Sequence, residues 1–447
     1  MKETVPLTRG QRDRQLMLSM IDNSMRLDYS WQRAYAHFSS ANTYYSEIYD
    51  TMDPTLWDTH FILAVRKYLA EYQDSNLALL VSNEHAEAAA LPDFEAHRCG
   101  DRLYVTRTLP GSLLHTGDVI THLGQRSVMQ ARELARFYLP KSDTDSYREN
   151  WTLALASVPE ITVLRDGETI SVPVIPRAHA DIMLAEAESS EKEESVEVRI
   201  FSGKALLMNL KNLSDRESAE ALLRNCLPEV SETPFWILDL RGNKSIDDTA
   251  FIPFLSILAD EPLMIPAARY YTRYTEQNCK RRIAWLEETK QRNPEMASFL
   301  DGWIQETREK SGSGFREEMD EELPEVITPG TAGYRRCVIL ADHTTSAAAE
   351  RFVRVCAKLP CCLIAGRETA GSCDTFGPVS YPLGDGYALV YPISITKEAH
   401  EEETAFAGKG VQPDLPIPWT PGDQGTDRDL EALLQRLEEE LPCREKA

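Results

Sequence analysis

The sequence lacks a long apolar run. No stretch of 18 consecutive apolar residues occurs among its 447 residues, so no membrane-spanning helix is expected. The opening segment, MKETVPLTRGQRDRQLMLSMIDNSMRLDYS, also has no continuous apolar core of the kind found in signal peptides. These two absences predict a cytoplasmic protein without a membrane partner.

The chain is poor in positive charge. It carries 48 Lys and Arg residues against 71 Asp and Glu residues, which gives a formal net charge of -23. Nucleic acids and anionic membranes are bound through basic patches. Neither is therefore expected as a partner, and general solubility is the simplest reason for the acidic surplus.

Cysteine and histidine occur without the spacing that marks a metal site. Nine cysteines is an odd number, and their spacing fits neither a disulfide framework nor a metal centre. The nine histidines lie singly, without paired ligand spacing. The sequence thus predicts no metal and no cofactor. Cys361 and Cys362 lie in an apolar, strand-like run, and we interpret them as buried thiols.

The N-terminal part of the chain changes character near residue 86. Residues 1–85 are predicted to be helical, because apolar residues such as Phe61, Val65 and Leu69 recur at helical spacing. Residues 86–178 contain short strands instead, including a hairpin around the turn RDGE at 165–168. The acidic segment 179–197 is predicted to be a linker.

Residues 198–420 alternate between apolar strands and amphipathic helices. Runs such as FWILDL and RCVILA predict an α/β core with a mainly parallel sheet. A charged segment at about 268–330 interrupts this core, and its helical periodicity, which includes Tyr270, Tyr271 and Tyr274, predicts a helical arm or lid. Residues 421–447 are predicted to end the chain in a helix.

Four stretches resemble, in order and spacing, those of tail-specific, or C-terminal-processing, serine peptidases. They are WILDLRGN (236–243), DHTTSAAAE (342–350), AGRETAGS (365–372) and GKGVQPDLPI (408–417). Ahead of them, GSLLHTGDVITHLGQRSV (111–128) resembles part of the PDZ domain of bacterial processing proteases. The resemblance covers roughly residues 30–420 and is nearer to the tricorn-core branch of the family.

The resemblance implies a fold and an activity. The expected fold class is α/β, with the crotonase-like (ClpP-like) core of tail-specific peptidases, a PDZ-like peptide-binding domain at 86–178 and an N-terminal helical region. The expected partners are peptides or protein C-terminal segments that add as a strand to a sheet edge, bound by a monomer or an oligomer. In an active relative a serine attacks the scissile carbonyl, a base takes its proton, and backbone amides hold the oxyanion.

The nucleophile of this family is missing from the sequence. Its loop reads Asp-x-x-Thr-x-Ser-x-x-Glu, and Asp342, Thr345 and Glu350 fall on the fixed positions, so the nucleophile position is Ala347. Ser346 lies one residue early, which on a helix is a turn of about 100°. We interpret Ser346 as a helix cap, with a role as the nucleophile as the alternative.

The general base is also altered. The tricorn-like branch places a Ser-His pair at the end of the helical region, where this sequence has Ser75 and Asn76. Asparagine cannot accept a proton near neutral pH, whereas histidine can. The other branch uses a lysine about 25 residues beyond the serine, a position that falls near Ser372, and TAGSCDTFG contains no lysine. His343 is a candidate replacement base, because it lies in the same turn as Ala347.

The oxyanion turn and a late glutamate depart from the family pattern as well. A glycine pair usually follows DLRGN, but this chain has Lys244 and Ser245 there, which leaves Gly242, Lys244 and Ala348 as candidate oxyanion donors. The late glutamate position falls near Ala407, with Glu403 as a distant substitute. The family pattern assigns substrate binding to Thr345, Gly371 and Ser372.

Two explanations remain for these departures. The chain is either a tail-specific serine endopeptidase whose nucleophile has been replaced, so that it is inactive or impaired, or a natural pseudo-peptidase that acts as a peptide-binding or scaffold protein. A single engineered change would alter only residue 347. Losses at the base, the oxyanion turn and the late glutamate favour the pseudo-peptidase.

Overall fold

The structure is a computed structural model, and it divides the chain into two compact units. Unit 1 comprises residues 1–89, 267–323 and 374–407, and unit 2 comprises 90–266, 324–373 and 408–447. The structure describes residues 9–31, 40–49, 57–82, 91–135, 148–156, 158–177, 197–201, 205–233, 235–265, 269–319, 325–329, 336–401, 409–421 and 427–440. Within these ranges, none of the helices has both the length and the apolar character that crossing a membrane requires.

Unit 1 combines helices with an antiparallel sheet. Its helices are α1 (Arg9–Leu27), α2 (Ala41–Tyr49), α3 (Trp57–Ala70), α10 (Glu276–Arg292), α11 (Ala297–Glu309) and α13 (Lys397–Glu401), with the short 3-10 helix η4 (Pro294–Met296) between α10 and α11. Its strands are β1 (Ala78–Val81), β14 (Arg269–Tyr274), β15 (Gly314–Met319), β19 (Thr375–Gly384) and β20 (Tyr387–Thr396). β20 is the hub of the sheet, because it pairs with β1, β14 and β19.

The charged segment at 268–330 is only partly helical, so the prediction of a helical arm is wrong at both ends. α10 and α11 form its middle, but β14 and β15 flank them and pair antiparallel. Tyr270, Tyr271 and Tyr274 lie on β14, where Tyr270 and Tyr271 pair with residues of β20. Aromatic residues favour strands, and the pairing across the sheet outweighs an apparent helical spacing over five residues.

The mainly parallel sheet of unit 2 confirms the predicted α/β core. Its strands, in spatial order, are β10 (Glu197–Phe201), β11 (Ala205–Asn209), β12 (Phe235–Asp239), β17 (Arg336–Ala341), β18 (Cys362–Gly366) and β21 (Leu415–Pro416). Only the β10–β11 pairing is antiparallel among these strands. A separate two-stranded ribbon is formed by β13 (Leu263–Ile265) and β16 (Glu325–Ile327).

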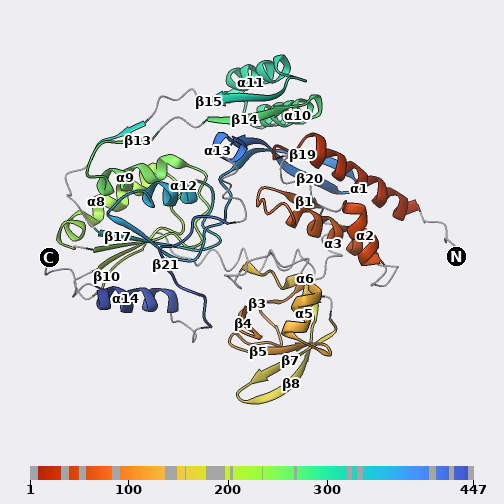
Figure 1. Cartoon of the computed structure of the whole chain (residues 1–447), viewed down its shortest axis with the longest axis horizontal. Helices are drawn as coiled ribbons and strands as arrows, with labels where there is room; N and C mark the ends of the chain where they lie inside the picture. Colours follow the sequence, from red (N-terminus) through yellow and green to blue (C-terminus); the bar gives the residue numbers. More distant parts are fainter. Residues whose placement is uncertain are drawn as a thin grey trace. The chain divides into compact units, whose positions relative to one another are not determined.

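Helices cover both faces of this sheet, as Figure 1 shows. One face packs against α8 (Arg216–Glu232), the 3-10 helix η3 (Asp248–Phe251), α9 (Ile252–Leu258) and α12 (Ala347–Cys356). The other face packs against α14 (Arg428–Glu440) through Leu433 and Leu437. All five residues of β12 are buried, as expected for a central parallel strand covered on both sides.

A second, β-rich part of unit 2 forms a core of its own. Its strands are β2 (Leu91–Pro92), β3 (Phe94–Cys99), β4 (Arg102–Thr108), β5 (Val119–Leu123), β6 (Arg126–Ser127), β7 (Glu160–Arg165), β8 (Glu168–Pro173) and β9 (Pro176–Arg177), with helices α5 (Val128–Ala135) and α6 (Thr152–Ala156). Asp166 and Gly167 have φ values of 51° and 85°, which a tight hairpin turn requires at both central residues. The predicted hairpin is therefore confirmed, whereas the predicted acidic linker falls almost wholly outside the described residues.

Candidate active site

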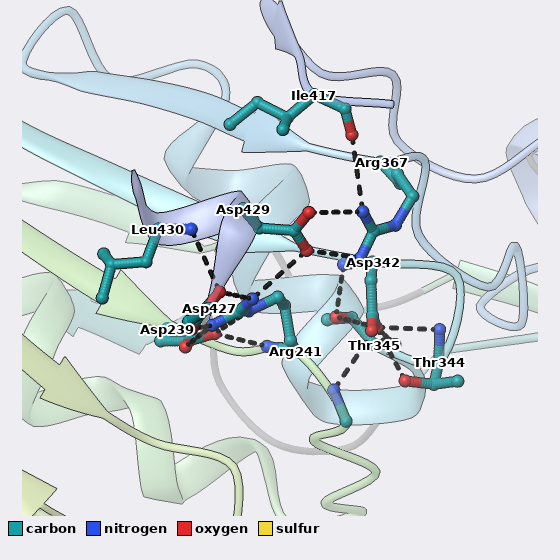
Figure 2. A network of polar contacts seen from close by, with 11 residues as sticks. Asp239, Arg241, Asp342, Thr344, Thr345, Arg367, Ile417, Asp427, Asp429 and Leu430 are labelled. Atoms are coloured by element: carbon teal, nitrogen blue, oxygen red, sulfur yellow. Dashed lines mark hydrogen bonds and ion pairs between the residues drawn. The ribbon is translucent and has the colours of Figure 1, made fainter. Parts of the chain in front are cut away.

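The site is built on the turn between β17 and α12. β17 ends at Ala341 and α12 begins at Ala347. In the turn, one carboxylate oxygen of Asp342 accepts hydrogen bonds from the N–H groups of Thr344 (3.0 Å) and Thr345 (3.2 Å) and from the Thr344 hydroxyl (2.7 Å). Figure 2 shows this arrangement. Burial alone would raise the pKa of Asp342, but the hydrogen bonds from Thr344 and nearby positive charge hold it below its ordinary value.

Ala347 occupies a strained backbone conformation. Its φ is +52°, in the left-handed region that costs an L-residue about 1–2 kcal/mol. Such strain persists only where the surrounding structure enforces it, and strained residues are found mainly at functional sites. Ser346 is extended, with φ -141° and ψ 172°, and it is the N-cap residue of α12, but its side chain makes no capping hydrogen bond. The strained residue is therefore the one that the sequence predicts as the nucleophile position. Ser346 has the predicted position of a helix cap but not its hydrogen bond.

Ser372 takes the place of a cap on this helix. The backbone N–H of Ala347 donates to the Ser372 hydroxyl oxygen at 2.9 Å, and that hydroxyl donates to a carboxylate oxygen of Glu350 at 2.8 Å. Ser372, twenty-five residues after Ala347, thus fixes the first backbone amide of α12. This is the position where one branch of the family is expected to carry its lysine.

Glu350 is the hub of the site. Its side chain is fully buried, and no cation among the described residues forms an ion pair with it, so neutral donors carry its stabilisation. These donors are the Thr369 hydroxyl, the Gly371 N–H (2.6 Å), the Ser372 N–H (2.7 Å), the Ser372 hydroxyl (2.8 Å) and the Cys373 thiol (3.2 Å). Burial and the charge of Glu350 raise the pKa of the Cys373 thiol, which disfavours its nucleophilic thiolate form.

Thr369, which donates to Glu350, also binds Val411 in the fourth motif. The Thr369 hydroxyl donates to Glu350 and accepts a hydrogen bond from the Val411 N–H at 2.7 Å. Gly410 has a φ of +65°, and a Cβ there would lie 2.1 Å from the Thr369 carbonyl oxygen. Only glycine fits so close an approach, which explains the glycine before Val411.

Two of the three predicted oxyanion donors are already occupied. The N–H of Ala348 donates to the Ser245 carbonyl at 2.8 Å, and the N–H of Gly242 lies 3.3 Å from Asp342, to which it donates. The third, the N–H of Lys244, has no acceptor among the described residues, and its side chain is exposed. An oxyanion hole needs donors directed at an empty position, so the turn at 242–245 does not offer the pair of amides that the family pattern implies.

Thr345 and Gly371 lie inside the protein rather than on a binding surface. The Thr345 side chain is fully buried, and its hydroxyl donates to the Leu240 carbonyl at 2.9 Å. The N–H of Gly371 is committed to Glu350. Of the three residues assigned to substrate binding, only Ser372 is half-buried and borders the turn at Ala347.

Asn76 belongs to unit 1, whereas Ala347 belongs to unit 2. The Asn76 amide donates to the carbonyl (3.0 Å) and the hydroxyl (2.9 Å) of Thr375. The carboxylate of Asp74 accepts from the Asn76 N–H (2.9 Å), the Thr375 hydroxyl (2.9 Å) and Tyr29 (2.7 Å), and burial raises the pKa of Asp74. Asn76 therefore links the segment between α3 and β1 to Thr375 at the start of β19. Its neighbour Ser75 is exposed.

His343 is a weak candidate for a replacement base. Burial is the largest cause that lowers the pKa of His343, to about 4. The positive charges of Arg148, Arg367 and Lys244 also lower this pKa, whereas the negative charge of Asp342 raises it. An imidazole with this pKa is neutral at pH 7, but it is a poor proton acceptor. The other candidates, Glu403 and the Ala407 position, lie outside the described residues.

A network of ion pairs, which the sequence did not reveal, lies beside the turn. Arg241 and Arg367 each belong to one of the four motifs, and they contact the carboxylates of Asp239, Asp427 and Asp429 (Figure 2). A buried arginine requires carboxylate partners, so the arginines in DLRGN and AGRETAG were a signal for such a network. The described residues contain no group of three or more His, Cys, Asp or Glu side chains that could hold a metal.

The core is an α/β fold in which a parallel strand leads through a strained turn into a helix. Residues 207–417 match the model of peptidase family S41. This confirms the resemblance carried by the four motifs. No curated protein matches the sequence significantly.

Solved structures of CPAF share the fold over nearly the whole chain. Mature CPAF complexed with lactacystin has a TM-score of 0.60 at 14% identity, covering 97% of this chain and 98% of that one. A CPAF mutant with alanine in place of a serine has a TM-score of 0.62 at 15% identity, with 96% of each chain covered. Mature CPAF alone has a TM-score of 0.58 at 15% identity, covering 93% of this chain and 94% of that one.

Proposed function

We propose that this chain is a pseudo-peptidase, which binds peptides or protein C-terminal segments and does not cleave them. The observation that carries the proposal is Ala347 at the first, left-handed residue of α12. A methyl group there cannot attack a carbonyl, so covalent catalysis has no starting point. The half-buried Ser346 lies one residue away and has a different backbone conformation.

The rest of the site supports the same proposal. The amide of Ala348, which would help to hold an oxyanion, is bound to the Ser245 carbonyl. The side chain at the base position is Asn76, which is tied to Thr375 and cannot take up a proton. Restoring a nucleophile alone would leave both of these functions missing.

A second candidate function is favoured by one observation. The backbone at residue 347 keeps its strained form, with its N–H fixed by Ser372 and the turn fixed by Glu350. This is the preorganisation that an active serine would need. On this candidate the chain is a tail-specific serine endopeptidase of which only the nucleophile has been replaced.

Peptide binding is proposed for the β-rich part of unit 2, which we interpret as a PDZ-like domain beside a crotonase-like core. Its loop between β4 and β5 is held by Arg165, which donates to both carboxylate oxygens of Asp118 (2.8 and 2.5 Å) and to the Leu113 carbonyl (2.9 Å). Leu113, in this loop, and Ile175, between β8 and β9, are exposed. An extended peptide that adds to a sheet edge gains affinity from backbone pairing and selectivity from side-chain pockets.

The location proposed for the protein is the cytoplasm. The eight cysteines of the described residues are free thiols, which is the state that a reducing compartment maintains. Cys361 and Cys362 lie side by side in β18 and the residue before it, with their sulfur atoms 3.7 Å apart.

The test uses fluorescently labelled peptides with a free C-terminal carboxylate, read by anisotropy, and mass spectrometry of the same mixtures after long incubation. The proposal expects saturable binding, weaker binding of the C-amidated peptides and no cleavage products. Arg165→Gln should weaken binding, whereas Arg126→Gln, at an exposed position of β6, should not. Cleavage by the unaltered chain, or the absence of binding across a broad set of peptides, would contradict it.

A further inference from the structure

The C-terminal helix contacts the site although it lies beyond the region that matches the family model. The family match ends at residue 417, and α14 begins at residue 428. Leu433 and Leu437 of α14 are buried against the sheet, together with Leu430 in its first turn. This apolar contact holds the helix in place, so the polar residues at its start have fixed positions.

Asp427 and Asp429 at the start of α14 bind Arg241. The Arg241 guanidinium donates to both oxygens of Asp427 (2.9 and 2.6 Å) and to one oxygen of Asp429 (3.2 Å). It also donates to both oxygens of Asp239 (2.9 and 2.5 Å), at the end of β12. Three carboxylates from two distant parts of the chain thus surround one guanidinium, as Figure 2 shows.

Asp429 also binds the second arginine. Arg367 donates to its two oxygens at 3.0 and 2.6 Å, and both side chains are buried. Such a two-bond contact fixes the geometry of both groups. A single aspartate of α14 therefore links the DLRGN turn to the loop that follows β18.

Each arginine is next to the backbone of the site. Arg241 precedes Gly242, whose N–H donates to Asp342 in the turn before α12. The backbone N–H of Arg367 donates to the carbonyl of Ala341, at the end of β17. A shift of either guanidinium would thus move the turn at 242–245 or the loop that leads to Ser372.

We infer that Asp427 and Asp429 are positioning residues, and that the first turn of α14 is part of the functional site. Through Arg241 and Arg367 the two carboxylates fix the turn at 242–245 and the loop at 367–373 against the start of α12. The inference deepens the site on which the proposed function rests.

The physical reason is the cost of an unpaired buried charge. Removing one partner of a buried ion pair leaves the other charge in the protein interior, and the chain responds by moving it toward water. Loss of the Asp429 charge would leave Arg367 without its two-bond partner. The expected response is local opening of the 367–373 loop and the 241–245 turn, with the sheet intact.

The test is hydrogen–deuterium exchange of the full chain, read by mass spectrometry on peptides that cover 239–248, 342–349 and 365–373. We expect exchange in these segments to become at least about tenfold faster in Asp427→Asn and Asp429→Asn. Glu431→Gln is the matched control, because Glu431 lies in the same helical turn but is exposed, and within the described part of the chain its carboxylate forms only a weak ion pair with Arg428 at 3.5 Å. Asp429→Glu, which keeps the charge, should restore part of the protection.

Three results would overturn the inference. They are unchanged exchange in all three segments, an increase spread evenly over the sheet strands, and an equal increase in Glu431→Gln. If either asparagine variant does not fold, Arg241→Lys provides the same test, because lysine keeps the charge but cannot bridge three carboxylates. The readout needs no peptide, so a failure of peptide binding and a failure of this inference are seen separately.

Discussion

The hydroxyl oxygen of Ser372 lies 2.9 Å from the backbone nitrogen of Ala347 and accepts its hydrogen bond. Through the same hydroxyl, Ser372 donates to the buried Glu350. The turn at Ala347, which we propose as the nucleophile position, is therefore held by a serine and a glutamate. On this proposal the support of the turn is present while the reacting atom is absent.

Glu350→Gln should destabilise the protein and loosen this turn. In glutamine an NH2 group, which is a donor, replaces one of the two carboxylate oxygens. At least two of the donors that now bind Glu350 would then meet another donor instead of an acceptor. We expect a loss of about 2–3 kcal/mol in the free energy of unfolding. Chemical denaturation monitored by tryptophan fluorescence measures it.

Arg351→Gln is the matched control for that variant. Arg351 is the next residue on α12, and its ion pair with Asp248 at 2.7 Å is partly exposed, with 43% and 61% of the side chains accessible. Such a pair contributes little to stability, so this change should cost well under about 1 kcal/mol. Equal losses in the two variants would mean that Glu350 has no special role.

His343 should make stability depend on pH in a defined window. Burial lowers the pKa of His343 from 6.5 to about 4. Between these values the unfolded state binds a proton that the folded state does not, so stability falls as the pH falls from 6.5 toward 4. His343→Gln should remove this part of the pH dependence, as measured by denaturation at pH 7, 6, 5 and 4.5.

The comparison with His122→Gln isolates the effect, because His122 has an exposed side chain in the β-rich part of unit 2. That variant should follow the parent protein at every pH. A parent curve that is flat between pH 6.5 and 4.5, or one that His343→Gln leaves unchanged, would show that the imidazole is not held neutral by burial.

The chain should not react with a fluorophosphonate serine probe. Ser346 is in an extended conformation, and no base is bound to it in the described structure, so its hydroxyl is not activated. Gel fluorescence after incubation with the probe measures the reaction. Labelling that disappears in Ser346→Ala would identify Ser346 as a nucleophile and overturn the assignment of that position to Ala347.

Local patterns in the sequence predicted the elements that local forces determine. The apolar runs around Trp236 and Ile339 became central strands, and the helix expected from about residue 348 begins at Ala347. The Asp166–Gly167 turn followed from the residues that a tight hairpin allows. In each case the deciding interactions lie within a few residues of one another.

Long-range contacts were beyond such patterns. Arg241 and Asp427 are 186 residues apart along the chain, and no periodicity links them. Glu350 was recognised as a fixed position of the loop, but the donors that converge on it come from residues 369–373. Tyr270 and Tyr271 of β14 were misassigned for the same reason, because their partners on β20 are far away in sequence.

Restoring the nucleophile separates the two explanations of Ala347. If only the serine has been lost, Ala347→Ser should recover hydrolysis of a peptide, because the strained turn and its Ser372–Glu350 support are in place. If the chain is a pseudo-peptidase, the new hydroxyl still lacks a base at Asn76 and a free amide at Ala348. The loss of a general base costs about a hundredfold to ten-thousandfold in rate, and the loss of one oxyanion donor costs about a hundredfold to a thousandfold.

We expect the second outcome. Ala347→Ser alone should give little or no turnover of a fluorogenic peptide, and Ala347→Ser with Asn76→His should give more, although the two effects need not multiply, because residues that act as a unit are not additive. Asn76→His alone is the control and should be inactive, since it lacks a nucleophile. Circular dichroism checks that each variant is folded. Robust proteolysis by the single Ala347→Ser variant would contradict the pseudo-peptidase and identify the chain as a peptidase that has lost only its serine.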